Sequence, residues 1–314
     1  MPKRRASESR PETPPEISAS PLFDGDAGER FTVADLLELP PPFQGETKEL
    51  FRPPEEGKVR KSPLYRLRDD ALFDSNDQYG FPALREDMLS EVIPTMTWDG
   101  GTPPPPGEIA LFTWGRFSIV NPPEYAKGGV LSFFTNDDRF EAIWNRHVQT
   151  MEYLHDFGWG AVIEPDFSVW FDDPMVVQMF NHYRSRWCAR YWQEVGVKII
   201  PNLGWWHPSC YEWAWTSIPE RPPVVAVDCR TTSLPEERDM WINSVNRGVE
   251  EVEPGAVVIY GDGRKWIEGK LLDGPKYVFV PSWIREFRRR ATKSKERTGT
   301  VIPKAPRWGT PVRG

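Results

Sequence analysis

Residues 161–166 read Ala-Val-Ile-Glu-Pro-Asp, a short apolar run that ends in polar residues. A helical stretch follows over 174–194, where apolar side chains recur at steps of three and four, and a second apolar run follows over 198–201. This order of strand, helix and strand is typical of a right-handed crossover between two parallel strands. The stretch therefore predicts an α/β fold on a mainly parallel sheet.

The same alternation extends over residues 108–283, which we expect to form the core domain. Short apolar runs predict further strands at 109–114, 130–134, 224–228, 257–260 and 277–280, and amphipathic patterns predict further helices at 137–156 and 235–252. A complete eight-fold barrel takes roughly 200–250 residues, more than this segment holds. We therefore expect an open sheet or an incomplete barrel with flanking helices.

The two ends of the chain differ from this core. Residues 1–107 hold 17 of the 33 prolines and no tryptophan before Trp98, which predicts a partly disordered Pro-rich arm with short helices at 31–37 and 85–93. The arm would wrap the core or, alternatively, dock a partner. Residues 284–314 hold ten basic and two acidic residues, a charge of +8, which leaves −15 for residues 1–283. This composition predicts a basic, largely disordered tail.

Composition narrows the class of protein. A chain of 314 residues with 15 Trp, 17 Phe and 9 Tyr can bury a core, and its net charge of −7 argues against a uniformly basic nucleic-acid coat. Three cysteines without Cys-x-x-Cys spacing exclude a disulfide framework and suit a reducing cytosol. No apolar run is long enough to span a membrane. We expect a cytoplasmic protein with no membrane partner.

Polar residues follow several of the expected strands. Ligands gather at the carboxyl ends of parallel strands, so we expect these residues to converge on one rim: Glu164, Asp166, Asn202, His207, Asp228, Arg230 and Asp262. Carboxylates that share a cleft can split into a catalytic acid and base, or hold a divalent metal ion. The alternative is that strand-end Asp and Asn residues only cap helices or form turns.

From this rim we select candidate site residues. Glu164, Asp166 and Asp228 are the candidate catalytic residues. Asn202 and His207 would bind a ligand, and Trp205 would stack on a base or sugar.

Arginines supply the candidate anion sites. Arg184 and Arg186 lie within the expected helix 174–194, where they would clamp a phosphate or carboxylate or, alternatively, pair with acidic side chains. In the basic tail we expect nucleic-acid binding through phosphate neutralisation by five residues: Arg285, Arg288, Arg289, Arg290 and Lys293. A solubilising tail, or one that associates with the acidic body of the protein, is the alternative.

Several short motifs recur in a family-specific order. They are Phe133-Phe134, 137–141 (Asp-Asp-Arg-Phe-Glu), Trp144-Asn145, 162–168 (Val-Ile-Glu-Pro-Asp-Phe-Ser), 173–175 (Asp-Pro-Met), 183–186 (Tyr-Arg-Ser-Arg), 191–193 (Tyr-Trp-Gln), 196–201 (Gly-Val-Lys-Ile-Ile-Pro), Ile218-Pro219, 225–227 (Val-Ala-Val) and 259–261 (Ile-Tyr-Gly). With these motifs the chain resembles the domain-of-unknown-function 4417 family over roughly residues 108–265. Gly204-Trp205 stands where that family usually has Ser-Trp.

The resemblance implies a protein carried by phages, plasmids or other bacterial mobile elements, in the cytoplasm of a bacterial host cell. It directs attention to motif positions Asp137, Asp166, Arg184, Arg186 and Trp205 but implies no reaction. Two hypotheses follow. One is an enzyme acting on a nucleotide, nucleic acid or sugar-phosphate, and the other is a non-catalytic accessory protein that binds nucleic acid through its Arg-rich tail. A structural protein of the phage particle is a third.

Overall fold

The computed structural model describes residues 73–118, 122–232 and 234–298 of the chain. Most of the Pro-rich arm, with the helix expected at 31–37, and the last part of the basic tail lie outside the described residues. Within the described part of the arm, the segment expected to be helical at 85–93 holds only the short 3-10 helix η1 (Glu86–Met88).

Within the described residues, eight parallel strands form two sheets. The first sheet has the order β1-β2-β3-β4-β5 and the second the order β6-β7-β8. The strands are β1 (Met96–Thr97), β2 (Ala110–Thr113), β3 (Val130–Ser132), β4 (Ala161–Ile163), β5 (Ile199–Ile200), β6 (Val224–Asp228), β7 (Ala256–Tyr260) and β8 (Lys276–Val280). All seven strands expected from sequence are present, and strand order follows chain order.

The two sheets are joined beyond the end of β5. Asn202 forms a parallel bridge with Ala226 of β6, where the Ala226 amide donates to the Pro201 carbonyl and the Leu203 amide donates to the Ala226 carbonyl. Parallel pairing thus continues from β1 to β8, so the carboxyl ends of all eight strands lie at one rim.

The inner faces of the strands share one apolar core. Its buried side chains come from every strand from β2 to β8: Leu111, Val130, Ala161, Ile163, Ile200, Val224, Ala226, Ala256, Val258, Tyr260 and Val280, with Phe134 beside them. Among the described residues no ladder joins β8 to β1, and a single hydrogen bond from Thr97 to the Pro281 carbonyl lies across that gap. The fold is therefore an incomplete barrel, which confirms the expected fold class.

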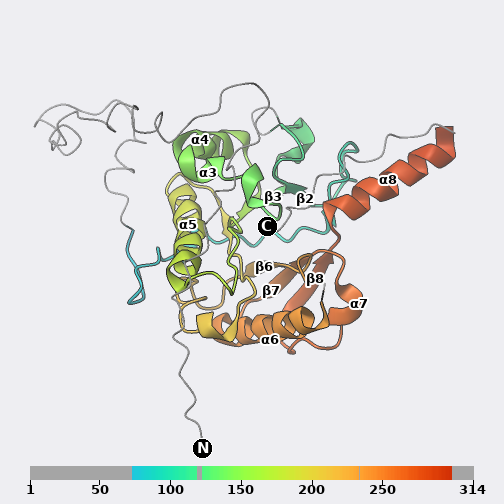
Figure 1. The fold of residues 1–314 in the computed structure, drawn as a ribbon. Coiled ribbons are helices and arrows are strands. Elements are labelled where there is room, and N and C mark those ends of the chain that lie inside the picture. The colour runs from blue at the N-terminus through green and yellow to red at the C-terminus, as the bar shows by residue number, and fades with distance from the viewer. Residues whose placement is uncertain (1–72, 119–121, 233, 299–314) are drawn as a thin grey trace, which may run out of the picture. The chain divides into compact units, whose positions relative to one another are not determined.

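Helices cover the outer faces of both sheets (Figure 1). Side chains of α4 (His147–Phe157) and α5 (Met175–Gln193) pack with those of β3, β4 and β5 in one apolar cluster. The helix α6 (Pro235–Val252) packs on β6 and β7 in a second cluster. Among the described residues the C-terminal helix α8 (Trp283–Thr298) is also long. The remaining helices are short: η2 (Glu124–Ala126), η3 (Asp137–Arg139), α3 (Ala142–Asn145), η4 (Pro208–Cys210) and α7 (Arg264–Ile267).

Two local features differ from the sequence prediction. The segment 137–156 is not one helix but η3, α3 and α4, because Arg146 leaves the helical region with φ −125° and ψ 43°. The strand β1 was not predicted, since two residues are too few to show a periodicity. Within the described ranges no helix is both long enough and apolar enough to cross a membrane.

The start of β4 supplies a test of the packing. A Cβ atom added at Gly160 would lie 2.3 Å from the Gly128 carbonyl oxygen, whereas one at Gly158 would meet nothing within 4 Å. We expect Gly160→Ala to lower the free energy of unfolding by about 3 kcal/mol or more, because a backbone atom blocks the new methyl group. Gly158 has φ +85°, so Gly158→Ala should cost only roughly 1–2 kcal/mol. Denaturant titration measures both, and equal losses would contradict the close approach of the two segments.

Candidate functional site

Polar side chains from four neighbouring strand ends meet at the rim. We name Asp166, Asn202, Asp228, Arg230 and Tyr260 the strand-end cluster; they follow or end β4, β5, β6 and β7. The Asn202 side-chain amide donates to Asp166 Oδ1 at 2.7 Å. The Arg230 guanidinium donates to both carboxylate oxygens of Asp228, through Nε at 3.0 Å and Nη2 at 2.5 Å. The register of parallel strands is what brings these groups together.

Asp166 has a pKa well above the ordinary value of an aspartate. The residue is half-buried. Desolvation and then the negative charge of Asp228 raise its pKa to about 7, while the hydrogen bond from Asn202 acts in the opposite direction. Asp137 adds to the rise and Arg230 opposes it. A carboxyl group that titrates near neutral pH can both donate and accept a proton.

The cluster continues along the rim through Tyr260. Arg230 lies over the Tyr260 ring, 5.0 Å from its centroid, and this ring stacks on Phe134. The Tyr260 hydroxyl lies 3.3 Å from the Thr113 hydroxyl and accepts a hydrogen bond of 2.9 Å from the Trp283 amide. The site therefore extends to the ends of β2 and β8.

Two of the strand-end residues also form turns, the alternative that we weighed against a role in a site. Asp228 Oδ1 accepts from the Arg230 amide at 2.8 Å, and Asn202 Oδ1 accepts from the Gly204 amide at 3.1 Å. These bonds use one oxygen of each side chain. Asp166 makes no such turn among the described residues, so turn formation does not account for its position.

Glu164 and Arg186 form a fully buried ion pair between β4 and α5. The same Glu164 oxygen accepts a hydrogen bond of 2.8 Å from the Asn202 amide. Burial raises the pKa of Glu164, and the charge of Arg186 and the Asn202 N–H oppose that rise. Both side chains are engaged with each other, so the geometry favours a structural role, and their predicted catalytic and ligand roles stay predictions.

The other predicted ligand residues have partners outside the cluster. Arg184 pairs with Glu141 at 2.5 Å and lies 3.9 Å from the centroid of the Phe167 ring. Trp205 packs on the outer apolar cluster around α6. His207 Nδ1 accepts from the Ser209 amide at 3.3 Å at the start of η4. No described contact joins these side chains to Asp166.

The predicted nucleic-acid-binding residues lie on α8. This helix runs from Trp283 to Thr298. Arg285 pairs with Asp262, Arg289 with Glu286 and Arg290 with Asp99. Arg288 and Lys293 are exposed and have no ion pair within the described part of the chain.

Two residues that sequence reasoning passed over lie beside the cluster. Arg116 follows β2 by three positions, and Arg139 ends η3 after β3. The rule that selected Asp166, applied to the strand expected at 109–114, would have selected Arg116 too. Within the described ranges, no group of three or more His, Cys, Asp or Glu side chains could hold a metal ion. The divalent metal stays a prediction.

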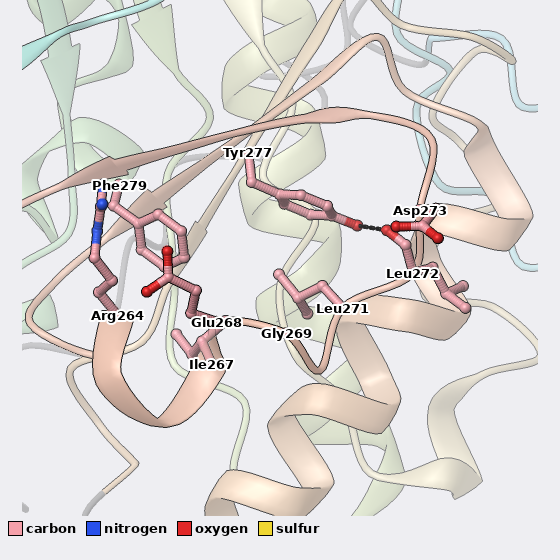
Figure 2. A pocket seen from close by; sticks show the side chains of 9 residues that line it. All are labelled: Arg264, Ile267, Glu268, Gly269, Leu271, Leu272, Asp273, Tyr277 and Phe279. Atoms are coloured by element: carbon pink, nitrogen blue, oxygen red, sulfur yellow. Dashed lines mark hydrogen bonds between the residues drawn. The ribbon is translucent and has the colours of Figure 1, made fainter.

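A surface pocket of about 400 Å³ lies elsewhere, beside β8 and α7 (Figure 2). Tyr277 and Phe279 line it from the face of β8 opposite the inner core, and Arg264 lies 4.7 Å from the Phe279 ring centroid. Figure 2 shows the Tyr277 hydroxyl donating to the Leu272 carbonyl, at 2.8 Å. None of the strand-end cluster lines this pocket, so the two features are separate.

Comparison with known proteins gives a family and two relatives. The family model described as Domain of unknown function (DUF4417) matches residues 111–278. The "Gene 1 protein" of Mycobacterium phage L5 is 31% identical over 137 residues, 44% of this chain and 59% of the relative. The "Gene 1 protein" of Mycobacterium phage D29 is 31% identical over 140 residues, 44% of this chain and 51% of the relative. The chain thus spans only about half the length of these relatives, and no solved structure matches it.

The buried pair yields a stability prediction. Arg186→Met leaves the Glu164 carboxylate buried without its partner, and we expect the free energy of unfolding to fall by about 3–5 kcal/mol. The double variant Glu164→Gln/Arg186→Met should lose less than the sum of the two single variants, because it leaves no unpaired charge. Arg247→Met, which breaks an exposed pair, should cost less than about 1 kcal/mol. Urea titration of the four variants would refute the structural role if Arg186→Met resembled Arg247→Met.

Proposed function

The chain belongs to the DUF4417 family, and we propose that it is an enzyme in which Asp166 moves a proton at a nucleotide, nucleic acid or sugar-phosphate bound at the strand ends. The observation that carries the proposal is the raised pKa, about 7, of the carboxyl group of a half-buried residue at the rim of a parallel fold. Strand ends are where α/β folds bind their ligands.

The neighbouring groups support distinct roles. Asp228 stays close enough to raise the pKa of Asp166, while Arg230 holds Asp228 in place through two hydrogen bonds. Asn202 donates to Asp166 Oδ1, which fixes the orientation of that carboxyl group. Asp166 is thus the proton-transfer group, and Asn202, Asp228 and Arg230 position it. The phage relatives support a setting in the cytoplasm of a bacterial host.

A second candidate function rests on α8. Its exposed face carries Arg285, Arg288, Arg289 and Lys293, at helical steps of three and four. Such a face can bind phosphates of nucleic acid without sequence preference. This helix follows the part of the chain that matches the family, so it would add nucleic-acid affinity to the core rather than replace its site.

The pKa of Asp166 predicts how stability depends on pH. Between about pH 4 and pH 7 the folded protein holds a proton on Asp166 that the unfolded chain, with a pKa of 3.8, releases. The free energy of unfolding should therefore fall with rising pH in this window, relative to Asp166→Asn, by an amount on the order of 2–4 kcal/mol. Thermal unfolding of both proteins at pH 4, 5.5 and 7 measures the difference, and a constant difference would contradict the raised pKa.

Catalysis is tested on the same variant. We expect a screen of nucleotides, short DNA and RNA and sugar-phosphates to find turnover by the full chain, and Asp166→Asn to lower it by about 10²–10⁴-fold. Asp156→Asn, at an exposed carboxylate near the end of α4 that leads into the start of β4, is the matched control and should keep full activity. Full activity of Asp166→Asn would show that the proton is moved by another group.

Nucleic-acid binding through α8 has its own test. We expect Arg288→Gln/Lys293→Gln to weaken binding of a 20-base-pair DNA duplex, and to make that binding less sensitive to salt, because two phosphate contacts are lost. Lys127→Gln/Arg247→Gln removes two positive charges elsewhere and should change neither. Fluorescence anisotropy at 50 and 200 mM salt gives both quantities, and equal salt slopes for all three proteins would argue against α8.

A further inference from the structure

Three arginines lie close enough to one another at the rim for their charges to interact. Arg116 follows β2, Arg139 ends η3 after β3, and Arg230 follows β6. The Arg139 side chain lies against Gly115, within 3.6 Å of where a Cβ atom of that glycine would be. Arg116 lies over the Trp283 ring, 4.3 Å from its centroid, and Arg230 lies over the Tyr260 ring. The Trp283 amide donates to the Tyr260 hydroxyl, so these two residues are in direct contact.

One of the three arginines, Arg116, is only partly satisfied by the protein. Asp228 pairs with Arg230, but no carboxylate of the described residues pairs with Arg116. The Arg116 Nε atom is buried and has no hydrogen-bond partner. Burial, and then the positive charge of Arg139 and that of Arg230, lower the pKa of Arg116. A partly buried guanidinium group that lies beside other positive charges and has an unused donor is stabilised when an anion binds to it.

We propose that Arg116, Arg139 and Arg230 form the binding site for a phosphate group of the substrate. This inference rests on the proposed function and assigns its anion recognition to residues other than Arg184 and Arg186. Those two guanidinium groups pair with Glu141 and Glu164, whereas Arg116 has an unused donor and pairs with no carboxylate among the described residues. A guanidinium group fits phosphate because two of its N–H groups can donate to two oxygens at once.

The position of this site relates it to the proton-transfer group. Arg230 belongs to both the strand-end cluster and the group of three arginines. It pairs with Asp228, which raises the pKa of Asp166. It also lies over the Tyr260 ring, and its charge lowers the pKa of Arg116. A phosphate held by the three arginines would therefore lie next to the strand-end cluster. The bond that reacts would be near this phosphate, and Asp166 would exchange its proton there.

Binding of inorganic phosphate to the full chain tests the site. Isothermal titration calorimetry at constant ionic strength should show phosphate binding to the wild type, and the affinity should fall at least tenfold in Arg116→Gln and in Arg139→Gln. Arg264→Gln, at an exposed arginine beside the β8 pocket, is the matched control and should bind as the wild type does. Arg288→Gln/Lys293→Gln should also bind normally, which separates the rim from α8.

The outcomes distinguish the two proposals. Unchanged phosphate affinity in both Arg116→Gln and Arg139→Gln, or no binding to the wild type, would overturn the phosphate site whatever Asp166 does. Asp166→Asn should keep or strengthen phosphate binding, because it removes a negative charge from the rim. If phosphate binding depends on Arg116 but the stability measurements show no raised pKa for Asp166, the phosphate site is upheld and the proton-transfer role is rejected. Thermal unfolding of each variant establishes that it is folded, and Arg139→Gln serves as the independent variant if Arg116→Gln is not.

Discussion

One buried carboxylate connects the parts of this structure that make up its site. Glu164, at the end of β4, pairs with Arg186 of α5 and accepts the amide of Asn202. Asn202 is the residue at which the first sheet bridges to Ala226 of the second. The same interaction thus ties a helix to its sheet, joins two sheets, and places the side chain that donates to Asp166. A lone buried charge is costly, so Glu164 and Arg186 constrain each other's position.

The division between the inner core and the rim explains where chemistry can occur. The inner faces of β2 to β8 are mostly apolar, and the Tyr260 hydroxyl among them is bonded at the rim. The strand ends, in contrast, hold Asp166, Asp228 and three arginines within reach of one another's charges. Desolvation raises the pKa of Asp166, and the negative charge of Asp228 adds to the rise because desolvation strengthens the effect of one charge on another.

Sequence reasoning succeeded where local signals were strong. The predicted bounds of β6, β7, α5 and α6 agree with the observed bounds to within one or two residues. The signals were the β-branched runs at 224–228 and 256–260 and the amphipathic patterns of the two helices. The segment 137–156 was misread as one helix, because apolar spacing continues across Arg146 although the backbone does not. Of the strand-end residues selected from sequence, Asp166, Asn202, Asp228 and Arg230 lie together at the rim, but the rule could not rank the group. Glu164 and Asp166 are two positions apart in sequence, yet only the first lies against an arginine in the core.

The amino-acid sequence by itself determined the alternation of strands and helices, the parallel sheet and the polar character of the strand ends, because periodicity and composition are local properties. Only the tertiary structure decided which charges pair. Arg184 and Arg186 are neighbours on one helix, but their partners, Glu141 and Glu164, come from different segments of the chain. The approach of Arg116, Arg139 and Arg230, and of Asp166 and Asp228, likewise depends on strand register. Through-space electrostatics depends on distances between residues that are far apart in sequence, and those distances exist only once the barrel has assembled.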